Sequence, residues 1–230
     1  MKRFWTEVAV DARPGGWVVL LDGREVRTPK RAPLLLPGPR LADAVRAEWA
    51  GVGDVLDPRA MPLTGIANAA IDHAAPDPAA FAAPLARYGE SDLLFYRADS
   101  PAPLVRRQAE AWDPLLAWAA RRYDAEFKVA TGIVHTPQPA HSLRRLTAAV
   151  EALDPFRLAA LTPLVTIGGS LLTALALLEG EVGEEEAWAA TQLDDLWQTE
   201  QWGEDAEALA VRHARRADWA AAVRFLGLLD

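Results

Sequence analysis

The chain has 230 residues, of which 51% are hydrophobic and 24% are charged, and it carries a net charge of −8. This composition is typical of a folded globular protein and excludes a mainly disordered chain. The acidic balance disfavours binding to nucleic acid or to anionic lipid, because both depend on Lys and Arg.

The sequence contains no cysteine, which excludes disulfides, zinc–thiolate sites, iron–sulfur clusters and cysteine nucleophiles. The first ten residues, MKRFWTEVAV, lack the apolar run of a secretory signal. The longest uncharged run, residues 163–178, is shorter than the roughly 20 residues that a membrane span needs. We therefore expect a cytoplasmic protein with no membrane insertion.

The N-terminal third has the pattern of a small antiparallel sheet. Asp22 and Gly23 lie between two runs that favour strands, and both residue types tolerate the positive φ angles of a tight hairpin turn. The other parts of this sheet are expected at residues 4–10 (a strand), 13–16 (a connection) and 34–36 (a short edge strand).

From residue 39 the hydrophobic spacing becomes helical. Leu41, Val45, Trp49 and Val52 are four, four and three residues apart, as on one face of a helix. An Asp-Pro pair occurs at residues 77–78, 113–114 and 154–155, and we expect each pair to begin a helix, with Asp as the N-cap. Further helices are expected at 104–112, 114–127, 141–153, 169–178 and 184–202, with a final pair ending near residue 229.

These patterns predict an α+β protein with a small antiparallel β-rich domain, residues 1–57, and a larger all-α domain, residues 58–230. The sequence GGS at 168–170 lacks the Lys and the spacing of a phosphate-binding loop, so we interpret it as close helix packing followed by a helix start at Ser170. The four histidines have no metal-binding spacing, and common hydrolase and zinc-protease motifs are absent.

The stretch DDLWQTEQWGEDAE, residues 194–207, contains two tryptophans and six carboxylates without a basic residue. A carboxylate–metal enzyme could use Glu200 and Glu204 with Asp194 or Asp195, but no E-x-x-H motif supplies further ligands and Gly203 would interrupt the helix. The alternative is a solvated acidic face, with the helix anchored by inward-pointing side chains at Trp188 and Leu196.

Trp197 and Trp202 are flanked by polar residues, which is unusual for core residues and typical of protein interfaces. The other tryptophans expected on helices, Trp49 among them, stand at core positions. The residues alone therefore favour a protein without an enzymatic site.

Eight segments in a fixed order resemble one family along nearly the whole chain. The segments are KRFW, VVLLDGREVRTP, AEW, MPLTGIANAAID, DLLFYR, RQAEAWDPLLAWA, TGI and EEAWAATQLDDLWQTEQWG. They are similar to the assembly chaperones that act on the alpha subunit of the ATP synthase F1 sector, which are mitochondrial in eukaryotes and have alphaproteobacterial homologues. The resemblance implies a β-rich N-terminal domain, a larger helical C-terminal domain and no catalysis, cofactor, bound metal or small-molecule substrate.

The resemblance also implies a partner and a site. Family members bind the unassembled alpha subunit and keep it from aggregating until it meets the beta subunit. Glu200, Trp202, Gly203 and Glu204 match a functionally sensitive family segment. We expect the contact patch to consist of Glu204, ranked first, together with Glu200, Trp202, Trp197 and Asp205. We expect structural roles for Trp49, Gly203, Asp22 and Gly23, and replacing Trp49 should unfold the junction between the β-rich and the helical domain rather than weaken a contact. An interaction module for another client remains an alternative.

Overall fold

The structure, a computed structural model, describes residues 2–203 and 206–229. They form the predicted α+β fold, with short antiparallel strands first and helices after them. The chain divides into two compact units: unit 1 is Met1–Pro78, Asp154–Ala160 and Ala220–Asp230, and unit 2 is Ala79–Leu153 and Leu161–Trp219. The domain boundary after residue 57 stays a prediction.

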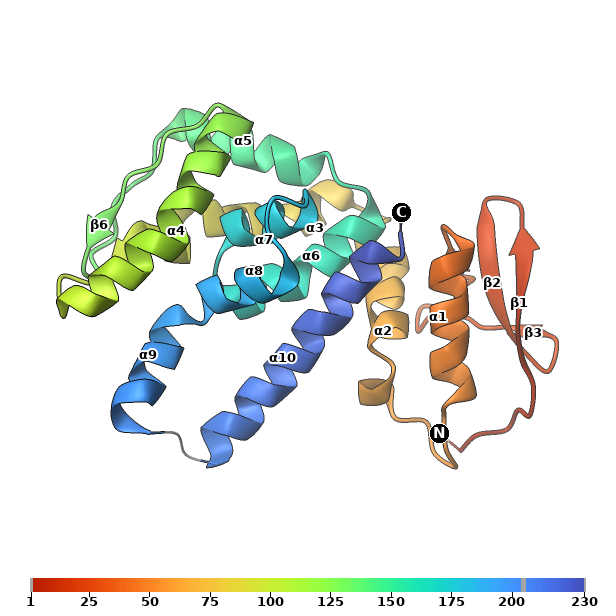
Figure 1. Cartoon of the computed structure of the whole chain (residues 1–230). Coiled ribbons are helices and arrows are strands. Elements are labelled where there is room, and N and C mark those ends of the chain that lie inside the picture. Colours follow the sequence, from red (N-terminus) through yellow and green to blue (C-terminus); the bar gives the residue numbers. More distant parts are fainter. Residues whose placement is uncertain (1, 204–205, 230) are drawn as a thin grey trace. The chain divides into compact units, whose positions relative to one another are not determined.

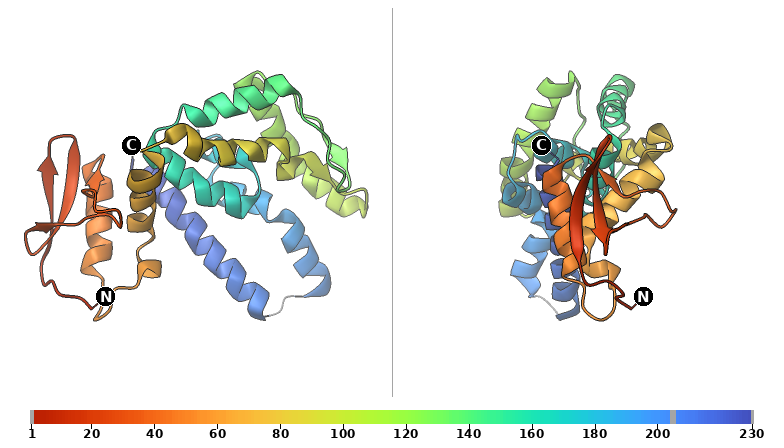
Figure 2. Two further views of the ribbon diagram at one scale, coloured as in Figure 1. Left: turned by 180° about the vertical axis from the view of Figure 1, so that it is seen from behind. Right: turned by 90° about the vertical axis from the view of Figure 1, so that its right-hand side faces the viewer.

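Unit 1 contains an antiparallel sheet in which the second strand pairs with the three others. The strands are β1 (Val8–Arg13), β2 (Gly16–Leu21), β3 (Arg24–Glu25) and β4 (Leu35–Leu36). Helix α1 (Pro39–Ala50) packs against β1 and β2, and α2 (Pro62–Ala69) packs against α1 (Figure 1). Figure 2 shows the sheet from its outer face, with α1 behind it.

The expected hairpin turn joins β2 to β3. Asp22 and Gly23 have φ angles of 48° and 78°, which is the geometry of a tight hairpin turn. The Asp22 carboxylate accepts hydrogen bonds from the backbone N–H groups of Thr6 (3.1 Å) and Glu7 (2.8 Å). The prediction that the first strand begins at Phe4 was wrong: it begins at Val8, because the preceding N–H groups bond to this carboxylate instead of to a strand partner.

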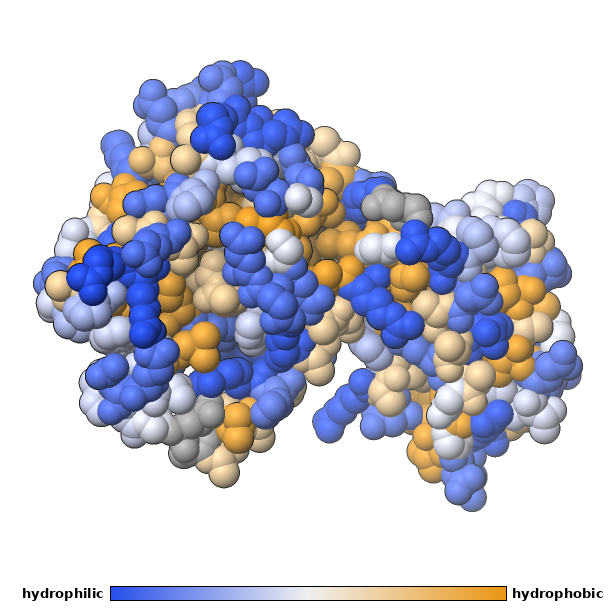
Figure 3. Space-filling view, in the orientation of Figure 1, coloured by the Kyte–Doolittle hydropathy of each residue, from blue (hydrophilic) through white to orange (hydrophobic). Residues whose placement is uncertain are grey.

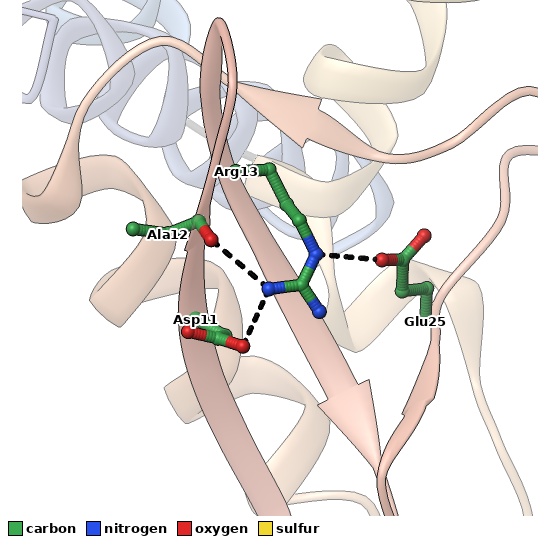
Figure 4. Close-up of polar contacts among 4 residues, drawn as sticks. All are labelled: Asp11, Ala12, Arg13 and Glu25. Carbon is green, nitrogen blue, oxygen red and sulfur yellow. Dashed lines mark hydrogen bonds and ion pairs between the residues drawn. The ribbon is translucent and has the colours of Figure 1, made fainter.

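The ends of β1 and β3 are connected by one arginine (Figure 4). Arg13 Nε donates to Glu25 Oε1 at 2.9 Å, while its Nη1 contacts the Asp11 carboxylate and the Ala12 carbonyl. The hydrogen bond and the positive charge of Arg13 hold the pKa of Asp11 below its usual value. The cluster is solvent-exposed, so we expect it to contribute little to the free energy of unfolding.

The core of unit 1 lies between the sheet and α1. Leu41 and Val45 on α1 are fully buried, and Trp49 is 9% exposed. The Trp49 ring lies 5.3 Å from that of Trp5, whose Nε1 donates to the Trp49 carbonyl at 3.3 Å. Trp49 is therefore a core residue of this unit.

Unit 2 is mainly helical, and its longest central helix, α4, packs against α5, α7 and α9 (Figure 1). Its helices are α3 (Pro78–Ala86), α4 (Ala102–Tyr123), α5 (Ala140–Glu151), α7 (Leu171–Leu178), α8 (Glu184–Thr191) and α9 (Leu193–Trp202). Helices α6 (Pro155–Gly168) and α10 (Ala206–Gly227) contribute residues to both units. An unpredicted parallel pairing joins β5 (Tyr96–Arg97) to β6 (Ala130–Thr131).

One of the three expected Asp-Pro helix starts was wrong. Helices α3 and α6 begin at the predicted prolines, and Asp154 caps α6 by accepting from the N–H groups of the next turn. At Pro114, however, α4 continues through the proline. Trp112 and Leu115 are buried on one face of α4, and this burial offsets the roughly 3 kcal/mol that an internal proline costs. Asp113 forms an ion pair with Arg97 at 2.8 Å.

Two other expected helices have different bounds. The segment 184–202 is divided at Gln192 into α8 and α9, where the Thr191 hydroxyl donates back to the Trp188 carbonyl at 2.9 Å. The final pair of helices is one continuous helix, α10. Across the described residues, no helix combines the length and the apolar character needed to cross a membrane.

The interpretation of GGS at 168–170 is confirmed. A Cβ atom on Gly168 would lie 2.9 Å from Thr191 and 3.0 Å from the Trp219 ring. The glycine therefore allows α6 to approach α8 and α10 closely. The Ser170 hydroxyl accepts from the Thr173 N–H at 3.0 Å and caps α7.

Candidate functional site: the groove between α9 and α10

The acidic stretch 194–207 covers most of α9 and the start of α10, which are antiparallel neighbours in unit 2 (Figure 1). Helix α9 ends at Trp202, and Gly203 follows with a φ angle of 82°, a conformation that favours glycine. The Gly203 N–H donates to the Thr199 carbonyl at 2.9 Å and closes the helix. Glu204 and Asp205, two residues of the expected patch, lie outside the described residues.

A groove of about 520 Å³ lies between these two helices, with Trp202 at one end. The α9 wall contains Asp195, Gln198 and Thr199, and the α10 wall contains Val211 and Arg215. The groove therefore combines one large aromatic side chain with carboxylate, amide and guanidinium groups.

Apolar side chains are exposed at the end of the helical hairpin. Trp202 is 79% exposed, and Leu209 and Val211 on α10 are 40% and 46% exposed. Figure 3 shows apolar surface in this part of unit 2. An exposed tryptophan that shares a groove with an exposed valine is typical of a protein-binding surface.

The opposite face of α9 contacts α4. Arg107 Nη1 donates to both carboxylate oxygens of Glu200, at 2.9 and 2.7 Å, and its guanidinium carbon lies 4.8 Å from the Trp197 ring centre. Gln108 Nε2 donates to Asp194 Oδ1 at 2.8 Å. These contacts orient α9 through two side chains that lie 93 and 86 positions earlier in the chain than their partners.

A hydrogen bond connects the two walls of the groove, and further contacts hold α10 beyond it. Arg212 Nη2 donates to Thr199 Oγ1 at 2.8 Å and joins the two helices directly. Further along α10, Arg216 forms an ion pair with Glu184 at 3.0 Å, and Trp219 packs edge-on against Trp188 at 5.5 Å. The part of α10 around Arg216 and Trp219 is therefore fixed against α8. The first turns of α10 have exposed side chains.

The structure separates the expected patch residues into two groups. Trp197 and Glu200 contact Arg107 on the face towards α4, whereas Trp202 lines the groove. Trp188 and Leu196 are both partly buried, and α9 itself has no fully buried residue. The role of Trp197, Glu200 and Trp202 in contacting a partner stays a prediction.

Two carboxylates of α9, Glu200 and Asp194, accept hydrogen bonds from side chains of α4. Both oxygens of Glu200 and one of Asp194 are engaged in this way. Within residues 2–203 and 206–229, no group of three or more His, Asp or Glu side chains is placed to hold a metal ion.

The family described as "ATP12 chaperone protein" matches residues 2–120. The chain belongs to this family. ATP12 proteins are a family of ATP synthase assembly chaperones.

Its relatives in the ATP12 family include eukaryotic and bacterial proteins. The mitochondrial protein atp12 of Schizosaccharomyces pombe is 25% identical over 222 residues, covering 90% of this chain and 76% of the relative. The crystal structure of Atp12 from Paracoccus denitrificans is 46% identical and matches with a TM-score of 0.94, covering 100% of this chain and 98% of that one. The Atu1473 protein of Agrobacterium tumefaciens is 42% identical, with a TM-score of 0.93, covering 100% of this chain and 86% of that one.

The sequence alone does not identify the residues that position the side chains of the candidate site. Arg107 lies 93 residues before Glu200, and no local pattern connects them. Leu209 and Val211 do give a signal, because they are apolar residues within a charged segment at the start of a helix. The sequence alone, however, does not indicate that they are exposed.

Proposed function

We propose that this ATP12 family member binds the unassembled alpha subunit of the ATP synthase F1 sector and prevents its aggregation until it pairs with the beta subunit. The observation that carries the proposal is Trp202, which is 79% exposed and lines the groove together with the exposed Val211. Family membership supports a client among the F1 subunits.

The chemistry of this surface suits reversible binding. A subunit outside its complex exposes apolar interface that would otherwise aggregate, and a few aromatic contacts can cover part of it. Charged groups beside the tryptophan, such as Asp195 and Arg215, can orient the encounter without adding much affinity. The client can then leave for its stronger final interface. No step in this role requires catalysis or a cofactor, and we place it in the bacterial cytoplasm.

The proposal is tested by diluting denatured alpha subunit into buffer and recording light scattering. Wild-type protein should suppress scattering, and Trp202→Ser should weaken binding at least about tenfold, as expected for a central aromatic contact. Ile133→Ser is the matched control, since Ile133 is 95% exposed in the same unit but does not line the groove.

The identity of the client is tested separately. Alpha subunit co-expressed with a tagged version of this protein should be retained on the tag, and added beta subunit should release it. If wild-type protein neither retains alpha nor suppresses its aggregation, the proposal is wrong. Equal loss in the Trp202 and Ile133 variants would instead show unspecific apolar binding and would contradict the assigned groove.

A further inference from the structure

Two of the segments that carry the family resemblance meet in unit 2 through their side chains. The segment RQAEAW begins at Arg107 on α4, and DDLWQTEQW runs along α9 from Asp194. Arg107 contacts Glu200 and Trp197, and the neighbouring Gln108 contacts Asp194. We call these five side chains the α4–α9 cluster. None of the five lines the groove that is proposed to hold the client, so contact with the client does not account for them.

Arg107 lies at the centre of the α4–α9 cluster. Its Nη1 donates to both carboxylate oxygens of Glu200, at 2.9 and 2.7 Å, and its guanidinium carbon lies 4.8 Å from the centre of the Trp197 ring. Glu200 is three residues after Trp197, so the two side chains are neighbours on one face of α9. A planar guanidinium can contact a carboxylate and an aromatic ring at the same time, which the compact ammonium group of lysine does less well.

Gln108 provides a second attachment, and it is only 2% exposed. Its Oε1 accepts from the Ala98 N–H at 2.8 Å, and its Nε2 donates to Asp194 Oδ1 at 2.8 Å. Asp194 is six residues before Glu200, so the two attachments are roughly 9 Å apart along the axis of α9. Two attachments at separate points fix both the direction of a helix and its rotation about its own axis.

Trp202 lies on the other side of α9. Successive residues of an α-helix are turned by roughly 100°, which places Trp202 roughly 160° around the helix from Glu200 and 140° from Trp197. The rotation that brings Glu200 onto Arg107 therefore turns Trp202 towards the groove. Helix α9 has no fully buried residue, so core packing fixes this rotation only weakly and the contacts with α4 become important.

We propose that Arg107 is a positioning residue for client binding. It fixes the rotation of α9 through Glu200 and Trp197, and it thereby presents Trp202 to the client. The inference rests on the proposed chaperone function. It gives Trp197 and Glu200 a role different from the direct client contact expected from the sequence, because both act through the orientation of α9.

The first test measures how much protein is needed to halve the light scattering of diluted alpha subunit. Arg107→Ala should require about three- to tenfold more protein than wild type, because Trp202 then has no fixed orientation. Arg107→Lys should lie between the two, since it keeps the charge and loses the planar contact. Arg106→Ala is the matched control, because Arg106 is an exposed arginine one position earlier on α4. Arg107 and Glu200 are about half exposed, so every variant should melt close to wild type.

An exchange of the two charges tests the pair itself. Arg107→Glu and Glu200→Arg should each weaken suppression of aggregation, because each places two like charges opposite one another. The double variant restores opposite charges and should recover to within about threefold of wild type. A folded double variant that is no better than the two single variants would contradict the assigned pair.

The second test measures the orientation of α9 without a client. The chain contains no cysteine, so spin labels can be attached at two chosen positions alone. Gln201→Cys on α9 and Arg121→Cys on α4 are suitable, because both positions are exposed and neither lines the groove. Pulsed electron paramagnetic resonance should give one narrow distribution of label distances in the wild-type background and with Arg106→Ala, and a clearly broader one with Arg107→Ala.

The two tests together separate the outcomes. Broader distances and weaker suppression in Arg107→Ala support the positioning role. Weaker suppression with unchanged distances would show that Arg107 contacts the client directly, and unchanged suppression would show that client binding does not depend on it; either result overturns the inference. If wild-type protein does not suppress alpha aggregation at all, the proposed function fails, while the distance measurement still decides whether Arg107 positions α9.

Discussion

Asp92 is a carboxylate with no exposed surface in unit 2. Its Oδ1 accepts from the Leu94 N–H at 3.1 Å and its Oδ2 from the Leu172 N–H at 3.0 Å. One side chain therefore caps the 3-10 turn Leu93–Phe95 and the first turn of α7. Burial raises the pKa of Asp92 to about 6, although these hydrogen bonds act in the opposite direction.

This raised pKa predicts a specific pH dependence of stability. Because the folded pKa lies above the unfolded value of 3.8, the stabilising contribution of Asp92 is complete below about pH 4 and is lost as pH rises through 6. The free energy of unfolding of wild type relative to Asp92→Asn should fall by about 2 kcal/mol between pH 4 and pH 7.5. Urea unfolding at both pH values measures it, and a difference that stays constant or grows would contradict the assignment.

The close packing of α6, α8 and α10 depends on Gly168, the last residue of α6, because glycine has no side chain. Gly168 lies against Thr191 and Trp219, and Trp219 is completely buried. A side chain at position 168 would have to displace either α8, through Thr191, or the indole ring of Trp219. Gly65 on α2 lies in open space and shows the opposite case.

We predict opposite effects of alanine at these two glycines. Gly168→Ala should lower the free energy of unfolding by about 1–3 kcal/mol, because overpacking outweighs the gain in helix propensity. Gly65→Ala should raise it by about 0.5–1 kcal/mol. Urea denaturation of both variants is the measurement, and a stable Gly168→Ala protein would show that the helices can separate at little cost.

At the scale of the whole molecule, the groove between α9 and α10 is the surface proposed to hold the client. All the residues that line it belong to unit 2.

The family resemblance adds a whole-molecule prediction for Glu204. Glu204→Lys should leave the fold intact and abolish suppression of alpha-subunit aggregation, because it reverses a charge in the segment between α9 and α10. Glu151→Lys, an exposed position at the end of α5, introduces the same charge change and should behave as wild type. Circular dichroism and light scattering test both variants, and normal suppression by folded Glu204→Lys would remove Glu204 from the site.

The sequence by itself determined the features that depend on near neighbours. The hairpin at Asp22–Gly23, the start of α6 at Pro155 and the end of α9 at Gly203 follow from backbone angles and caps within a few residues. The ordered segments likewise indicated the ATP12 family, which the comparisons confirm.

Only the tertiary structure decided the features that depend on distant parts of the chain. Helix α4 continues through Pro114 because burial of one face outweighs the local cost of proline. Glu200 faces Arg107, and Trp202 faces the groove, because packing against α4 sets the rotation of α9. Such contacts leave no local pattern, since the free energy that fixes them comes from side chains far apart in the sequence.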